Sequence, residues 1–146
     1  MKKIVLILIF AIFAFGAVDF TDPKPSFDNP RKWLIRINSS EVEKVNHILN
    51  AMNNVLKGYP EESLQIEVIF YANGIRVARK DFDERVLKRI KSLMIYDNIE
   101  FIVCKNTMDT MGWKKDMFID DVSYVQIGIA EAIEKINGGW IDVSPY

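Results

Sequence analysis

The hydrophobic positions of this chain follow two periodicities in alternation. Short runs rich in β-branched and aromatic residues are typical of strands, and apolar residues spaced three or four positions apart are typical of helices. The runs expected to form strands are KWLIRIN (32–38), SLQIEVIFYA (63–72), IEFIVC (99–104), VSYVQIG (122–128) and WIDVSPY (140–146). The segments expected to form helices are SSEVEKVNHILNAMNNVLKG (39–58), DFDERVLKRIKSLM (81–94), a short one over 106–111, and IAEAIEKIN (129–137).

Local signals indicate where several of these elements end. Ser40 and Glu43 have the spacing of a capping box, which satisfies free backbone N–H groups at a helix start. Gly58 is placed to cap the same helix at its carboxyl end, and Gly112 is placed to break the short helix. The pair Asn73-Gly74 is a turn signal after the second expected strand.

The alternation of strands and helices predicts one α/β domain over residues 32–146. Strands separated by helices pair in parallel through right-handed crossovers, with helices on both faces of the sheet. We therefore expect a three-layer α/β/α domain with about five mostly parallel strands, a count taken from the runs above. Residues 17–31 (AVDFTDPKPSFDNPR) are rich in proline and turn-forming residues, and they are expected to form an extended lead-in. The order of the strands does not follow from one sequence.

The first 16 residues have the layout of a secretory signal peptide. Lys2 and Lys3 precede an apolar run from Ile4 to Phe15, and small residues follow, which predicts a cut before Ala17. The alternative is an uncleaved membrane anchor, but the run is shorter than the roughly 20 residues that span a bilayer. We therefore expect a periplasmic or otherwise exported protein that meets a membrane only through its signal peptide, before cleavage.

Composition and charge narrow the function classes. Loss of the signal peptide's two lysines takes the formal net charge from −1 to −3, and the charges are mixed in sign, so nothing indicates nucleic-acid binding. There is no glycine-rich phosphate loop and no cysteine or histidine spacing typical of a metal site, so no cofactor or metal is predicted. The single cysteine, Cys104, excludes an internal disulfide and leaves a free thiol, a bridge to another chain, or a buried inert residue.

Candidate site residues gather at the carboxyl ends of the expected strands. Ligands of open parallel sheets bind beyond these ends. Asn73 and Gly74 follow the second strand, Cys104 closes the third, and Gln126 and Gly128 follow the fourth.

Cys104 has a physical argument for reactivity. It precedes a helix, whose free N–H groups and dipole stabilise a thiolate, and Lys105 adds a nearby cation. Asn106 or Thr107 is placed to cap that helix. The alternative is that Cys104 is a small packing residue at the end of a buried strand. His47 is the only histidine, and it is expected to lie on the surface of the first helix.

Four stretches together resemble a known family. The most specific is FIVCKNTMDTMGW (101–113), in which a strand leads into Cys-x-Asn-Thr and a short helix closed by glycine. The others are IEVIFYANGIRVARK (66–80), VSYVQIGIAEAIEKINGGW (122–140) and GGWIDVSPY (138–146). In this order and spacing the chain resembles the DsrE/DsrF-like family of sulfur-relay proteins, within it the YchN-like group, and specifically an exported branch.

The resemblance implies a flavodoxin-like domain that assembles into homo-oligomers, as trimers or hexamers. It implies that Cys104 accepts sulfur as a persulfide and exchanges it with a donor or acceptor protein or a small sulfane-sulfur compound. The pocket residues would be Asn73, Gly74, Lys105, Asn106, Thr107 and Gly128. The alternative function is a non-catalytic oligomeric binding or structural module in which Cys104 is buried.

Overall fold

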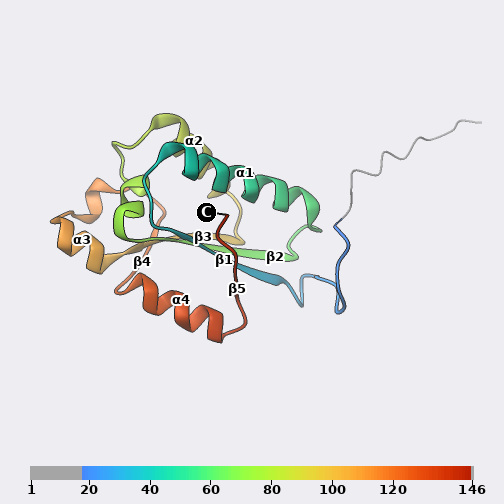
Figure 1. Cartoon of the computed structure of the whole chain (residues 1–146). Helices are drawn as coiled ribbons and strands as arrows, with labels where there is room; N and C mark the ends of the chain where they lie inside the picture. Colours follow the sequence, from blue (N-terminus) through green and yellow to red (C-terminus); the bar gives the residue numbers. More distant parts are fainter. Residues whose placement is uncertain (1–17, 146) are drawn as a thin grey trace, which may run out of the picture.

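The computed structural model describes residues 18–145, which form three layers around one parallel sheet (Figure 1). The sheet has five strands in the order β4-β3-β2-β1-β5, and every neighbouring pair is parallel. The strands are β1 (Arg31–Ile37), β2 (Leu64–Phe70), β3 (Ile99–Cys104), β4 (Ser123–Val125) and β5 (Ile141–Asp142). The three-layer α/β/α fold predicted from the sequence is confirmed. The predicted signal peptide, 1–16, lies outside the described residues.

The helices cover the two faces of the sheet unequally. They are α1 (Val42–Gly58), α2 (Glu84–Leu93), α3 (Lys105–Met111) and α4 (Gly128–Asn137), with two 3₁₀ segments, η1 (Ala72–Ala78) and η2 (Lys115–Met117). From β1 to β4 the chain moves across the sheet in one direction, so right-handed crossovers place α1 and α2 on the same face. The return from β4 to β5 runs the other way and places α4 alone on the opposite face (Figure 1).

This asymmetry divides the interior into a large core and a small one. The large core lies between the sheet and α1 and α2, and Phe70 and Phe101 stack within it at 5.9 Å between ring centroids. The small core lies under α4 and consists of Leu34, Ile69, Ile102 and Ala132, with Tyr71, Val125 and Trp140 packed at its margin. The site described below sits at one end of this small core.

Two local predictions need correction. The capping box at Ser40 and Glu43 is wrong, because α1 begins at Val42 and its N-cap residue, Glu41, makes no side-chain capping bond. The Ser39 hydroxyl instead accepts a hydrogen bond from the Glu41 N–H. The Asn73-Gly74 turn is the start of η1, a seven-residue 3₁₀ segment whose apolar side chains enter the core.

The last two strands are shorter than the sequence indicates, for local reasons. β4 ends at Val125 because the next residue, Gln126, directs its backbone oxygen to the Asn106 N–H rather than to a neighbouring strand. β5 ends at Asp142 because the Ser144 hydroxyl takes the place of a backbone acceptor and receives the Arg36 N–H. The predicted break at Gly112 is confirmed, since this residue ends α3 with φ of 68°.

The lead-in packs against the domain without forming a helix or strand over residues 18–30. The Phe20 ring meets the Tyr59 ring edge-on at 4.8 Å, and the Arg31 guanidinium donates to the Thr21 and Pro23 carbonyls. These contacts hold the lead-in at the amino ends of the strands. Within residues 18–145, none of the helices is both long and apolar enough to cross a bilayer.

Candidate functional site

Cys104 lies at the junction between the third strand and a short helix. It is the last residue of β3 and the N-cap residue of α3, and its side chain points toward the first turn of α4. The residue is only 5% exposed. The candidate site is therefore a nearly covered thiol at the carboxyl edge of the sheet, between β2 and β4.

Hydrogen-bond donors converge on the sulfur of Cys104. The Gly128 N–H donates to Sγ at 3.2 Å. Burial raises the pKa of the thiol, but the Thr107 hydroxyl and the N–H groups of Gly128, Thr107 and Asn106 outweigh that effect and lower the pKa below its ordinary value. These groups all donate to the anion, so the arrangement favours a thiolate, which is the reactive form of cysteine.

Two neighbouring loops hold these donors in place. The Thr107 hydroxyl oxygen accepts the Ala72 N–H at 3.3 Å, which leaves its own hydrogen available to the sulfur. The Gln126 backbone oxygen accepts the Asn106 N–H at 3.0 Å, and the Gln126 side-chain amide donates to the Asn106 side-chain oxygen at 3.1 Å. The ends of β2, β3 and β4 are thus joined around Cys104.

Gly128 is tightly packed, and a side chain there would press on its neighbours. A Cβ at this position would lie 3.1 Å from Ile69 Cγ2, 3.2 Å from Cys104 Cβ and 3.5 Å from Tyr71 Cβ. The missing side chain lets the first turn of α4 approach the strand ends closely enough for its N–H to reach the sulfur.

The other predicted site residues lie around this cluster in different ways. Lys105 begins α3, but the main causes of the lowered Cys104 pKa are hydrogen bonds rather than its charge. Asn73 is exposed on η1, and Gly74 is buried on η1 against the backbone of Ile37. The structure therefore brings together Cys104, Asn106, Thr107 and Gly128, with η1 packed beside them.

Sequence reasoning missed the contribution of Ala72. This residue has φ of 47°, in the left-handed region that alanine rarely adopts, and its N–H points to the Thr107 hydroxyl. No feature of the sequence signals this conformation. Gln126 was recognisable as a residue at a strand end, but its two hydrogen bonds to Asn106 depend on β4 lying beside β3.

Two cavities of the described domain lie away from the sulfur. A cavity of about 680 Å³ lies at the amino ends of the strands, and its lining mixes aromatic residues such as Tyr59 and Tyr96 with charged ones such as Glu61. A second, of about 320 Å³, lies where the strand order reverses beside β1. Its two cations are already ion-paired, Arg36 with Asp142 and Lys44 with Glu41.

Other candidate chemistry is not assembled in the described part of the chain. His47 lies on α1, on the sheet face opposite α4, with Nε2 3.9 Å from the Glu43 carboxylate. Residues 18–145 contain no group of three or more histidine, cysteine or acidic side chains able to hold a metal ion. Trp113 packs at the margin of the large core, with the Arg79 guanidinium 4.3 Å from its ring centroid.

Thr107→Val is expected to raise the pKa of Cys104, because valine keeps the branched shape and removes the hydroxyl donor. The rate of alkylation by iodoacetamide, measured against pH, reports this pKa. In wild type the midpoint should lie below that of the urea-unfolded chain, and the variant's midpoint should lie above wild type's. The pKa of Cys104 is lower in the folded chain than in the unfolded chain, where it is about 8.5. The Cys104 thiolate therefore adds its full contribution to the free energy of unfolding above the unfolded pKa. This contribution is lost as pH falls through the folded pKa.

Thr110→Val is the matched control for this experiment. Thr110 lies on the same helix, and its hydroxyl donates to the Asn106 carbonyl at 2.9 Å rather than to the sulfur. The control should leave the alkylation midpoint unchanged. Equal shifts in the two variants would mean that helix stability, and not the Thr107 hydroxyl, sets the pKa.

Comparisons with known proteins agree with this fold. A model described as the DsrE/DsrF-like family matches residues 36–141. A solved protein of unknown function from Methanobacterium thermoautotrophicum is similar in structure, with a TM-score of 0.72 and 23% identity. The match covers 79% of this chain and 99% of that one. None of the curated proteins matches the chain.

Proposed function

Because the chain belongs to the DsrE/DsrF-like family, we propose that it is a sulfur-transfer protein that carries sulfur on Cys104. The observation that supports this function is the set of donors around the sulfur, which lowers the pKa of Cys104 despite burial. A cysteine that served only for packing would gain nothing from such donors, since a neutral thiol is a weak acceptor.

The proposed reaction is a pair of thiol exchanges. The Cys104 thiolate attacks the outer sulfur of a donor persulfide, a sulfur–sulfur bond breaks, and the donor leaves as a thiolate. Cys104 then holds the sulfur as a persulfide. An acceptor thiolate attacks the terminal sulfur, and the Cys104 thiolate is released. The low pKa serves this second step because a more stable thiolate is a better leaving group.

The side chains that border the sulfur define its approach. Asn106 and Gln126 are both exposed, and they hydrogen-bond to each other beside Cys104. The Thr107 hydroxyl and the buried Gly128 N–H donate to the sulfur. In this proposal the Asn106–Gln126 pair opens to admit the donor, and the Thr107 and Gly128 donors stabilise the leaving thiolate.

Loading with sulfur tests the proposal. The chain from Ala17 onward is incubated with inorganic polysulfide, and its intact mass is measured before and after addition of a reductant. Wild type should gain a reductant-sensitive sulfur adduct, and Cys104→Ser should gain none. Transfer of that sulfur to a second thiol, followed by recovery of the original mass, would complete the cycle.

Two further variants make the loading experiment specific. Thr107→Val should load more slowly at neutral pH than wild type, because less of its Cys104 is thiolate. Thr110→Val should load at the wild-type rate. A wild-type chain that gains no adduct, and so behaves as Cys104→Ser does, would rule out the carrier function.

A second candidate function is a non-catalytic binding or structural module. The 5% exposure of Cys104 favours it, because a relay thiol must meet its partner. The two functions differ in the loading experiment: a module should remain unloaded in its folded state and react only when unfolded.

The proposal includes export from the cytoplasm. Its support is the arrangement of two lysines, an apolar run and small residues in the first 16 positions. N-terminal sequencing of the protein from its own cells should find Ala17 first. A first residue within 1–16 would count against cleavage at this site.

A further inference from the structure

Backbone groups that are hydrogen-bonded to one another enclose the sulfur of Cys104. The Gly128 N–H lies 3.2 Å from Sγ, and the Gln126 backbone oxygen lies 3.9 Å from it. The same oxygen accepts the Asn106 N–H at 3.0 Å, which joins the end of β4 to the start of α3 directly beside the sulfur. A donor cannot widen this frame without breaking backbone hydrogen bonds, each of which contributes to stability.

Two side chains form the movable part of the enclosure. Asn106 and Gln126 are both exposed, and the Gln126 side-chain amide donates to the Asn106 side-chain oxygen at 3.1 Å. Exposed side chains change rotamer within nanoseconds, so this pair can open while the backbone frame stays in place. The opening toward Cys104 is then only as wide as two rotated side-chain amides allow.

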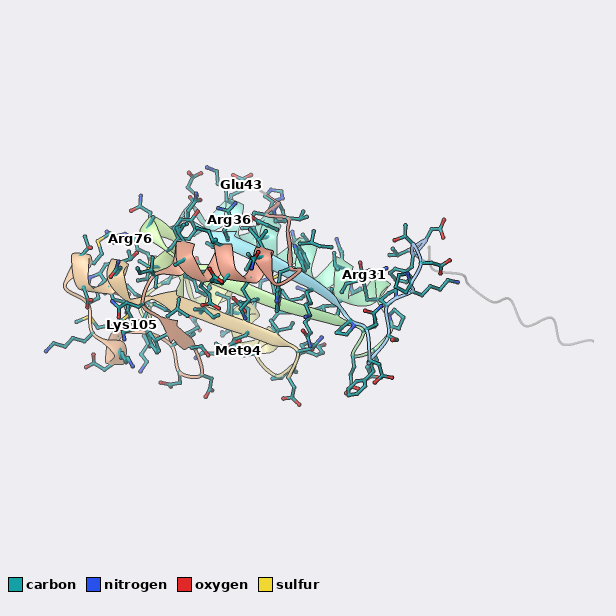
Figure 2. The ribbon with its side chains drawn as sticks, turned by 90° about the horizontal axis from the view of Figure 1, so that it is seen from below. Arg31, Arg36, Glu43, Arg76, Met94 and Lys105 are labelled. Carbon is teal, nitrogen blue, oxygen red and sulfur yellow. The ribbon has the colours of Figure 1, made fainter. Side chains whose placement is uncertain are left out.

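The two cavities described above do not provide room beside the sulfur. Neither of their linings includes Cys104. Figure 2 shows Lys105, the residue that follows Cys104, at the opposite end of the domain from Arg31 and the lead-in, where the larger cavity lies. The body of a large donor therefore finds neither of these hollows next to the thiol.

We propose that Asn106 and Gln126 restrict Cys104 to small, unbranched sulfane-sulfur anions such as inorganic polysulfide, and exclude sulfur that is carried on a peptide or protein. This inference rests on the proposed sulfur-transfer function and names its substrate class. A polysulfide chain is one sulfur atom wide along its whole length. Glutathione persulfide, by contrast, carries a tripeptide two bonds from the reacting sulfur, so the tripeptide would press on the frame before the two sulfurs meet.

The exchange with polysulfide is balanced without an oxidant or a reductant. The Cys104 thiolate attacks the terminal sulfur of a hydropolysulfide, and a bond forms between these two sulfurs. The neighbouring sulfur–sulfur bond breaks, and its electron pair leaves with the shortened polysulfide. Cys104 keeps one sulfur as a hydropersulfide, whose proton passes to water. The reverse exchange has the same transition state, so an acceptor is held to the same size limit, which hydrosulfide satisfies.

Two donors of different size test this limit. The chain from Ala17 onward is treated separately with inorganic polysulfide and with glutathione persulfide, and the rate of sulfur gain is followed by intact mass. The urea-unfolded chain gives the ratio of the two rates without any enclosure. The folded chain should prefer polysulfide by at least about 10-fold more than the unfolded chain does, a difference within the range of steric discrimination by a binding site.

Gln126→Ala tests the residues that set the limit. The variant loses the side-chain amide but keeps the backbone oxygen that accepts the Asn106 N–H. It should react faster with glutathione persulfide, and its preference for polysulfide should fall at least ~5-fold. A changed pKa of Cys104 would alter both rates alike, so the ratio isolates the effect of size. Asn54→Ala removes an exposed amide from α1, on the other face of the sheet, and should keep the wild-type preference.

The outcomes separate this inference from the carrier function. A folded wild type that is no more selective than the unfolded chain would overturn the size limit and leave the carrier function standing. A Gln126→Ala variant with the wild-type preference would do the same. A folded chain that gains sulfur from neither donor would overturn the carrier function, and the size limit with it.

Discussion

Gly74→Ala is expected to lower the free energy of unfolding by about 3 kcal/mol or more. A Cβ at Gly74 would lie 1.9 Å from the Ile37 carbonyl oxygen, 2.5 Å from its carbon and 2.9 Å from the Asn38 nitrogen. All three are backbone atoms, so no side-chain rotation relieves the clash. The end of β1 and the start of η1 must separate for the variant to fold.

That separation would cost contacts on both sides of Gly74. The Ile37 carbonyl that blocks the position also accepts the Tyr71 N–H at 3.1 Å, which ties the end of β2 to β1. The segment η1 inserts Ile75, Val77 and Ala78 fully into the large core. Moving η1 outward therefore loses a backbone hydrogen bond and buried apolar area together. Urea unfolding followed by circular dichroism measures the loss.

Gly112→Ala separates this packing effect from the intrinsic preferences of glycine. Gly112 has φ of 68°, and a Cβ there would meet nothing within 4 Å. Its replacement should cost only about 1 kcal/mol, the strain of a left-handed alanine. A Gly74→Ala variant no less stable than Gly112→Ala would show that the backbone around η1 adapts freely.

The fold was predictable because its signals are local and strong. IEFIVC is apolar except for Glu100 and becomes β3 with the same bounds, and its other five residues are buried. The period of the second helix is equally clear, and Asp83 caps it by accepting the N–H groups of Arg85 and Val86. The strand order was not predictable, because residues on β1 carry no information about whether β2, β5 or both will lie beside them.

The site was only partly predictable because its donors come from two segments that are far apart in the sequence, the starts of α3 and α4. The sequence placed Cys104 before a helix, and the nearest donors, Asn106 and Thr107, follow from that position. The Gly128 N–H reaches the sulfur only because β4 lies beside β3, which is a fact of strand order. The left-handed backbone of Ala72 likewise depends on where η1 packs, and alanine gives no sign of it.

A carboxylate is buried beneath α4 and is paired with a lysine of that helix. Glu67 points from the middle of β2 into the small core, is 1% exposed, and is ion-paired with Lys135 of α4. Burial raises the pKa of Glu67 against the opposing effect of Lys135. Burial lowers the pKa of Lys135, but Glu67 outweighs it and the net change is upward. The ammonium thus compensates a charge that the interior would otherwise exclude.

Lys135→Met is expected to cost about 2–4 kcal/mol at pH 8. Removing one partner of a buried pair costs about 3–5 kcal/mol, and the 27% exposure of Lys135 reduces that figure. The loss should shrink toward pH 5. Without Lys135, the pKa of Glu67 in the folded chain lies further above its unfolded value of about 4.3. The variant therefore keeps its stability at pH values below the unfolded pKa. It loses stability as pH rises through the folded pKa, where the buried carboxyl must ionise. Urea unfolding at several pH values measures both effects.

Two controls identify the buried charge as the cause. The double variant Glu67→Leu/Lys135→Met removes both charges and should recover stability with little pH dependence, since apolar residues of similar volume often replace a buried pair without loss. Lys88→Met breaks an exposed pair with Glu84 and should change stability by less than about 0.5 kcal/mol. If the double variant is as unstable as Lys135→Met, packing of the lysine stem is the cause instead.

If the ion pair also fixes α4 against the sheet, Lys135→Met should raise the alkylation midpoint of Cys104, because Gly128 at the start of that helix donates to the sulfur.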